Sequence, residues 1–155
     1  MEVMDRPCVL VVDDERDLLK LTAHFLEHAG FIVDGVASGT DALQALAAVR
    51  YDLLLCDKNL PGVHGLQVVE EARRLQPWIA TVLMTAWPEI ISLKDLDLDG
   101  YLAKPFRSGR DLADSLTEAI AHRARQRVEK TSASTSTSSE NLAPVIKDPA
   151  PTPRS

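Results

Sequence analysis

The chain alternates between short, continuously apolar stretches and longer stretches in which apolar residues recur every three or four positions. Three short stretches, Cys8–Val12, Leu53–Cys56 and Ile79–Met84, are apolar at nearly every position. Strands whose apolar residues do not alternate with polar ones are typical of a parallel sheet covered on both faces, so these stretches predict buried strands. Phe31–Val36 and Gly100–Ala103 are weaker strand candidates.

Three sets of apolar residues at helical spacing lie between the strands. Their members are Leu18, Leu21, Phe25 and Ala29; then Ala42, Leu43, Leu46 and Val49; and then Leu66, Val69, Ala72 and Leu75. Gly30 and Pro77 end the first and third helices, and Ser38 with Asp41 forms a capping-box-like start for the second. A last helix is predicted from about Ser108 to Lys130.

Five strands and about five helices in alternation predict a doubly wound α/β sandwich. Because crossovers between parallel strands are right-handed, the loops that follow the strands meet at one edge of the sheet. Candidate chemistry is therefore expected at the carboxyl ends of the strands.

The composition changes once along the chain. From Thr131 to Ser139, eight of nine residues are Ser or Thr, and four prolines follow between positions 144 and 153. Such a segment buries too little apolar surface to offset the entropy of ordering, which predicts a disordered tail at 131–155. Residues 7–122 then form one domain, and 123–130 form a basic extension of the last helix.

Charge and hydropathy exclude several classes of function. Residues 1–122 contain 11 Lys and Arg but 20 Asp and Glu, and such an acidic domain is repelled by nucleic-acid phosphates. No apolar run approaches the roughly 18 residues of a membrane-spanning helix, and the N-terminus lacks the features of a signal peptide. We therefore expect a cytoplasmic protein with no direct nucleic-acid binding and no membrane insertion.

Polar residues follow four of the predicted strands. Asp13 and Asp14 follow the first strand, Asp57 the third, Thr85 the fourth and Lys104 the fifth. Three carboxylates that converge at one sheet edge repel one another, which demands a cation or raised pKa values. Oxygen ligands are what Mg²⁺ prefers, and a lysine with a hydroxyl group nearby suits an incoming phosphoryl group.

These residues belong to motifs that are found together in one family. The motifs are Val11-Val12-Asp13-Asp14-Glu15, Leu55-Cys56-Asp57, Leu60-Pro61-Gly62 with Gly65, Met84-Thr85-Ala86, and Tyr101-Leu102-Ala103-Lys104-Pro105-Phe106. In their order and spacing the chain resembles the receiver domain of two-component response regulators over about residues 7–122. The resemblance implies a flavodoxin-like or CheY-like fold with strand order 2-1-3-4-5.

The resemblance also implies a role for each residue that matches a motif. Asp57 would accept a phosphoryl group, and Mg²⁺ would be bound by Asp13, Asp14, Asp57 and the backbone carbonyl of Asn59. Lys104 would pair with the phosphoryl oxygens.

Further roles concern the response to phosphorylation. Thr85 and Ala86 would contact the bound phosphoryl group, with Thr85 turning its hydroxyl toward it and Tyr101 moving inward. Pro105 would follow a cis peptide bond. Trp87, two positions beyond Thr85, is placed to shield phosphorylated Asp57 from water, or else is an exposed apolar residue of the loop.

The implied function is a phosphorylation-dependent signalling switch, and not a turnover enzyme. Its expected partners are a sensor histidine kinase or phosphotransfer protein and a downstream target protein, because 155 residues leave no room for an output domain; a homodimer stays open. The alternative is a pseudo-receiver that binds partners without phosphorylation. A phosphohydrolase of the haloacid dehalogenase class is disfavoured, because Asn59 occupies the position of the second aspartate that such enzymes need.

Some residues depart from the family or invite other chemistry. The segment between Thr85 and Lys104 is about one helical turn shorter than is usual, which predicts a short or irregular fourth helix. Lys58 and His64 are also unusual at their positions. His24 and His28 have the spacing of helical zinc ligands, but no third ligand is evident. Cys8 and Cys56 lie about 13 Å apart in parallel strands, so we expect two reduced thiols.

Overall fold

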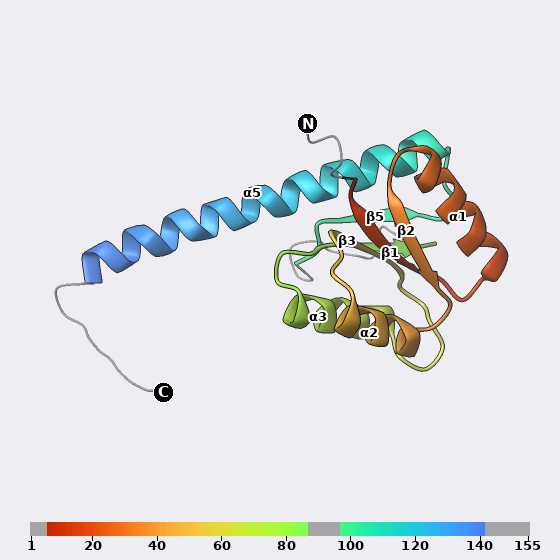
Figure 1. Cartoon of the computed structure of the whole chain (residues 1–155), viewed down its shortest axis with the longest axis horizontal. Helices are drawn as coiled ribbons and strands as arrows, with labels where there is room; N and C mark the ends of the chain where they lie inside the picture. Colours follow the sequence, from red (N-terminus) through yellow and green to blue (C-terminus); the bar gives the residue numbers. More distant parts are fainter. Residues whose placement is uncertain (1–5, 87–96, 142–155) are drawn as a thin grey trace. The chain divides into compact units, whose positions relative to one another are not determined.

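The computed structural model describes residues 6–86 and 97–141 of the chain. Its strands form one parallel sheet with the order β2-β1-β3-β4-β5 (Figure 1). They are β1 (Cys8–Val12), β2 (Ile32–Val36), β3 (Leu53–Asp57), β4 (Ala80–Thr85) and β5 (Gly100–Ala103). The predicted fold class and strand order are therefore confirmed, and each predicted strand lies within one residue of its observed bounds.

Helices cover both faces of the sheet (Figure 1). They are α1 (Arg16–His28), α2 (Gly39–Ala48), α3 (Gly65–Leu75) and α5 (Gly109–Asn141). Side chains of β1 alternate between the two layers: Leu10 and Val12 pack with α2 and α3, whereas Val9 and Val11 pack with α1 and α5. The predicted fourth helix falls largely within 87–96, which lies outside the described residues.

Two helices begin at the serines that the sequence predicts. The Oγ of Ser38 accepts a hydrogen bond from the backbone N–H of Asp41 at 3.1 Å, and the Oγ of Ser108 accepts one from Asp111 at 3.0 Å. Each bond satisfies a backbone donor that the first turn of a helix leaves unpaired. The starts of α2 and α5 are thus fixed by local side-chain chemistry.

The buried face of α1 differs from the prediction. Leu21 is 47% exposed and Ala29 is exposed, whereas Thr22 and Leu26 are fully buried and Leu19 packs against the core. The segment contains several overlapping apolar sets at helical spacing, and each is compatible with an amphipathic helix. Contact with the sheet selects the set that includes Leu19 and Leu26.

The last helix also differs from the prediction, because α5 does not end at Lys130 but continues to Asn141. Residues 131–141, expected in the disordered tail, are helical. Ser and Thr are weak helix formers but do not break a helix, and no Gly or Pro occurs between Gly109 and Pro144. The chain divides into two compact units, 1–123 and 124–155, and α5 contributes to both.

A buried carboxylate fixes the start of β5. The Asp99 side chain is fully buried, and its Oδ2 accepts hydrogen bonds from the backbone N–H of Thr81 at 2.9 Å and from Arg123 Nε at 3.1 Å. Arg73 of α3 lies 3.2 Å from the same oxygen, and His122 Nδ1 lies 2.7 Å from Oδ1. Groups from α3, β4 and α5 therefore hold the amino end of β5, the edge opposite the predicted site.

Candidate functional site

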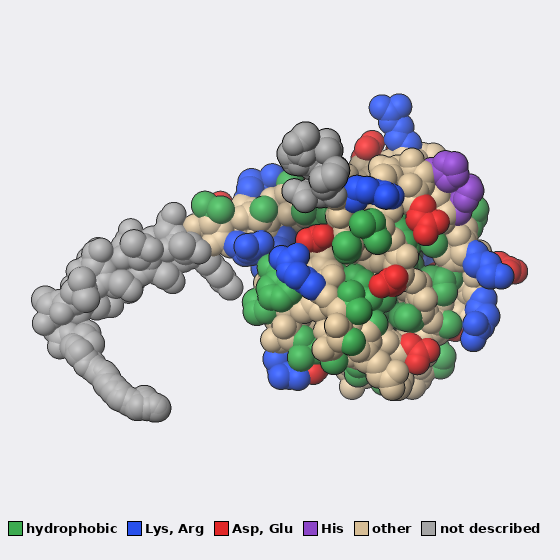
Figure 2. Space-filling view, viewed as in Figure 1, with side chains coloured by type: hydrophobic (Ala, Val, Ile, Leu, Met, Phe, Trp, Pro, Cys, Tyr) green, Lys and Arg blue, Asp and Glu red, His purple; other side chains and the backbone are tan. Residues whose placement is uncertain are grey.

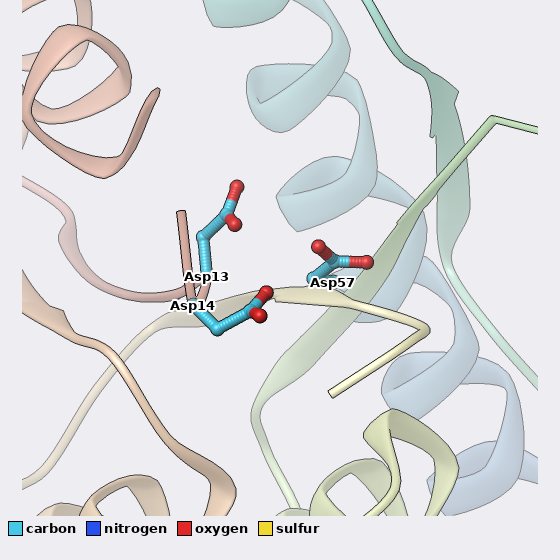
Figure 3. A group of neighbouring side chains, drawn as sticks. All are labelled: Asp13, Asp14 and Asp57. Atoms are coloured by element: carbon cyan, nitrogen blue, oxygen red, sulfur yellow. The ribbon is translucent and has the colours of Figure 1, made fainter. Parts of the chain in front are cut away.

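Three carboxylates meet where β1 and β3 end side by side. Val12 pairs with Cys56 in the sheet, so the next residues, Asp13 and Asp57, are also neighbours. Asp13, Asp14 and Asp57 each offer an oxygen, and these oxygens all lie within 4.8 Å of one another. Figure 3 shows the three side chains projecting from the two strand ends into one space. The predicted convergence of the carboxylates is thus present in the structure.

The three carboxylates differ in their surroundings. Asp13 is fully buried and Asp57 nearly so, whereas Asp14 is exposed. Burial raises the pKa of Asp13, and the negative charge of Asp57 adds to this effect. A hydrogen bond from the Glu15 backbone N–H, at 2.9 Å from Oδ1, and the ammonium of Lys104 act in the opposite direction without cancelling it.

The Lys104 side chain lies between the carboxylates. Its Nζ is 2.9 Å from Asp57 Oδ2, 3.5 Å from Asp13 Oδ2 and 3.4 Å from Glu15 Oε1. Burial acts to lower the pKa of Lys104, but the hydrogen bond to Asp57 and the surrounding negative charges outweigh it and raise the pKa. Lys104 is therefore a cation at neutral pH, with three acceptors for its three N–H donors.

The backbone of neighbouring strands positions Lys104. Its N–H donates to the carbonyl of Thr85 at 2.9 Å, and the Lys104–Pro105 peptide bond is cis, the isomer that the resemblance implies. Lys104 follows β5 as Thr85 ends β4, so pairing of the edge strand β5 with β4 brings the side chain to the carboxylates.

Glu15 is the member of this arrangement that the sequence analysis did not assign. It directly follows Asp13 and Asp14, and its carboxylate contacts Lys104 while its side chain remains 65% exposed. The only sign of its role in the sequence is that it is the third of three consecutive acidic residues after a buried strand. Only the fold shows that the third one reaches a lysine 89 positions away.

The other predicted residues differ in their positions and surroundings. Thr85 is buried at the end of β4, and the following Ala86 is exposed. The backbone N–H of Asn59 donates to Asp57 Oδ1 at 3.0 Å. Tyr101 is 37% exposed on β5, so its ring is not enclosed within the site. Trp87 lies outside the described residues.

Gly65 permits α3 to start directly beside the backbone of Asp57 and Lys58. A Cβ atom at this position would lie 2.4 Å from the carbonyl oxygen of Asp57 and 2.8 Å from the Cα of Lys58. Real Cβ atoms do not approach backbone this closely, so only glycine fits here without a shift of the chain. The glycine of the predicted motif therefore has a packing role under Asp57.

Other candidate residues do not join a site. His24 and His28 are exposed with ring centroids 4.3 Å apart, and among the described residues the one group of three potential metal ligands is the aspartate cluster. Cys8 and Cys56 are free, and burial raises the pKa of Cys56 strongly, which keeps this thiol protonated. The strand register places Cys8 four positions before Val12, the partner of Cys56, in agreement with the predicted absence of a disulfide.

Basic and acidic side chains are mixed on one face of the molecule. Lys and Arg side chains are interspersed with Asp and Glu side chains on the face shown in Figure 2. That face offers no continuous basic surface to a nucleic acid. No helix in the described part of the chain combines the length and apolarity needed to cross a membrane.

Comparison with known proteins assigns this chain to a family. The family model for the response regulator receiver domain matches residues 9–120. The chain belongs to this family.

Individual relatives are regulators and receiver domains. The chain is 36% identical over 107 residues to the C4-dicarboxylate transport transcriptional regulatory protein DctD of Rhizobium meliloti, covering 67% of this chain and 23% of that protein. It is 37% identical over 101 residues to the transcriptional regulatory protein TcrA of Mycobacterium tuberculosis, covering 63% and 40%. The chain thus spans less than half the length of these curated relatives.

Solved structures agree with this assignment. A CheY-like receiver domain protein of Methanospirillum hungatei has a TM-score of 0.69 at 26% identity, with 79% of this chain and 99% of that chain covered. The response regulator protein TrrA of Thermotoga maritima, in complex with Mg²⁺ and BeF, has a TM-score of 0.64 at 28% identity, with 73% and 98% covered.

Proposed function

We propose that this chain is a phosphorylation-dependent switch in which Asp57 accepts a phosphoryl group. The observation that carries the proposal is the position of Asp57, which contacts the Lys104 ammonium at 2.9 Å and lies beside two further carboxylates. A carboxylate and a phosphoryl group are both negatively charged and repel each other. The Lys104 ammonium, and a cation held by the three carboxylates, would offset this repulsion and allow Asp57 to attack phosphorus.

The proposed reaction transfers a phosphoryl group from a phosphohistidine of a sensor kinase or phosphotransfer protein. A carboxylate oxygen of Asp57 forms a bond to phosphorus as the phosphorus–nitrogen bond breaks, and the electron pair of that bond returns to the imidazole. The product is an acyl phosphate on Asp57. Lys104 offsets the negative charge of the transferred group, because its N–H donors can move from carboxylate oxygens to phosphoryl oxygens as hydrogen-bond acceptors.

The donor set suits a hard divalent cation. It contains only oxygen ligands, and the exposure of Asp14 leaves one side open to water, as Mg²⁺ prefers. Asp13, Asp14 and Asp57 would hold the ion together with the backbone carbonyl of Asn59. When bound, Mg²⁺ would supply positive charge at the phosphoryl oxygens.

The proposed response to phosphorylation involves β4 and β5. Thr85 would turn its hydroxyl toward the new phosphoryl group, with Ala86 beside it, and Tyr101 would move inward from its partly exposed position. The acyl phosphate carries about two negative charges where the carboxylate carried one, and it adds oxygen acceptors, which together can bias a two-state surface. A downstream target protein would read that surface, so signalling would require neither direct nucleic-acid contact nor catalytic turnover.

Intact mass spectrometry after incubation with Mg²⁺ and acetyl phosphate tests this proposal. We expect the wild type to gain the mass of one phosphoryl group, and Asp57→Asn and a chelator-treated sample to gain none. Asp114→Asn, which removes an exposed carboxylate on α5, is the matched control and should still be modified. If neither acetyl phosphate nor phosphoramidate modifies the wild type, the alternative of a phosphorylation-independent pseudo-receiver is favoured.

A further inference from the structure

The Lys104–Glu15 contact has no place in the function proposed above. We propose that Glu15 is a specificity residue whose negative charge at the mouth of the site selects against free dianionic phosphodonors. The proposal rests on Asp57 as phosphoacceptor. It concerns which donors Asp57 reacts with, and not whether it reacts.

Glu15 is held close to the reacting group. Its Oε1 lies 3.4 Å from Lys104 Nζ, which itself lies 2.9 Å from Asp57 Oδ2, so the two oxygens can be no farther apart than the sum of these distances. The backbone of Glu15 is fixed as well, because its N–H donates to Asp13 Oδ1 at 2.9 Å and its carbonyl accepts from the N–H of Leu19. With 65% of its side chain exposed, Glu15 borders the site on the solvent side.

Glu15 differs from the three aspartates because a metal ion bound at the site would not neutralise its charge. Asp13, Asp14 and Asp57 form the group that can share a metal ion, and Glu15 is outside that group. A cation bound by the aspartates would therefore leave Glu15 with Lys104 as its neutralising partner. Because Lys104 is also the cation that meets the phosphoryl oxygens, Glu15 both competes for Lys104 and repels an approaching anion.

Two small phosphodonors that differ in net charge allow the electrostatic effect of Glu15 to be measured apart from its effect on the phosphoryl-transfer step. Near neutral pH acetyl phosphate is a dianion, whereas phosphoramidate carries a protonated nitrogen and is a monoanion. Asp57 attacks phosphorus in both; with acetyl phosphate the phosphorus–oxygen bond breaks and acetate leaves with the electron pair. With phosphoramidate the phosphorus–nitrogen bond breaks and ammonia leaves, because the nitrogen already carries its proton. Glu15 should therefore oppose acetyl phosphate more strongly.

The expected effect follows from the distance. One negative charge about 6 Å from a dianion in water, screened at ~0.1 M salt, lowers the encounter rate about fourfold, and the effect on a monoanion is about twofold. At ~1 M salt, where the Debye length is about 3 Å, both effects fall below about 1.5-fold.

The experiment compares phosphorylation rates of the full chain with each donor in Mg²⁺, followed by intact mass. In Glu15→Gln, we expect about fourfold faster modification by acetyl phosphate and about twofold faster modification by phosphoramidate, so that the ratio of the two rates doubles and returns toward the wild-type value at high salt. Glu15→Asp keeps the charge and should keep the wild-type ratio. Glu27→Gln makes the same charge change at an exposed position near the other end of α1 and should change neither rate.

The possible outcomes separate this inference from the proposed function. A modified wild type whose rate ratio is the same in Glu15→Gln overturns the role of Glu15 and leaves Asp57 as the acceptor. A change of equal size for both donors, or one that does not depend on salt, also overturns it, because a merely structural role would affect both donors alike. An unmodified wild type overturns the proposed function instead.

Discussion

Asp13→Asn should stabilise the metal-free protein, although it removes a residue of the functional site. The substitution keeps the size of the side chain and an oxygen that accepts the Glu15 N–H, but it removes a buried negative charge. Functional sites often hold like charges together at the expense of stability.

The magnitude follows from the distances in the cluster. At an effective dielectric constant of about 20, repulsion from Asp14 and Asp57 at the outer limit of the cluster amounts to about 7 kcal/mol, and attraction to Lys104 at its observed distance to about 5 kcal/mol. The difference predicts a gain of about 2 kcal/mol in the free energy of unfolding. For a domain of this size that corresponds to a rise of about 5 to 10 °C in the unfolding midpoint.

The pH dependence gives the sign an independent check. Because burial raises the pKa of Asp13 in the folded state, the folded protein retains this proton to a higher pH than the unfolded chain does. The penalty for the ionised group therefore develops as the pH rises from the unfolded pKa of about 3.9 through the folded pKa, and it is complete above that. Lys104 stays charged throughout this range, since its pKa is raised. The advantage of Asp13→Asn should be largest at neutral pH and shrink in acid.

Urea and thermal unfolding with a chelator, at neutral and acidic pH, measure this effect. Added Mg²⁺ should stabilise the wild type more than the variant, because a ligand that binds the folded state adds to its stability. Asp114→Asn, an exposed control, should change the free energy of unfolding by less than about 0.5 kcal/mol. An Asp13→Asn protein that is less stable than the wild type in chelator at neutral pH would refute the reasoning and show that the Lys104 contact outweighs the repulsion.

Three further substitutions test other parts of the structure. Gly65→Ala should cost about 1 to 3 kcal/mol in urea unfolding and slow modification of Asp57, because its Cβ would lie 2.4 Å from the Asp57 carbonyl oxygen; unchanged stability and rate would contradict this packing. Asp99→Asn should cost about 3 to 5 kcal/mol, because it removes the buried anion that Arg123 Nε contacts at 3.1 Å; a loss under about 1 kcal/mol would show that the ion pairs contribute little. Ser38→Ala should cost about 1 kcal/mol through loss of the cap of α2 while the rate of modification stays the same; a slower rate would mean that this cap also affects the site.

Gly100→Ala is the matched control for Gly65→Ala. A Cβ at Gly100 would make only ordinary contacts, at 3.7 Å to Val82 and 3.9 Å to Ala119. The free energy of unfolding of Gly100→Ala should therefore stay within about 1 kcal/mol of the wild-type value. If both alanine variants lose the same stability, the close approach of α3 to Asp57 is not the cause.

The sequence by itself determined the sheet and the position of the site. Continuously apolar strands and helical spacing between them depend on neighbouring residues, and the rules of parallel crossovers then fix which loops meet. Asp13, Asp57 and Lys104 could be placed together on this basis, because each lies where a strand ends. The motifs of one family added the expected roles.

Only the tertiary structure decided which side chains meet. The burial of Leu19 rather than Leu21 depends on how α1 rotates against the sheet, and the spacing of apolar residues permits more than one rotation. The contact of Glu15 with Lys104 and the ion pairs of Asp99 join residues that are far apart in sequence. Such pairings arise because the register and packing of whole elements set side-chain distances, whereas sequence patterns report only local preferences for helix, strand and turn.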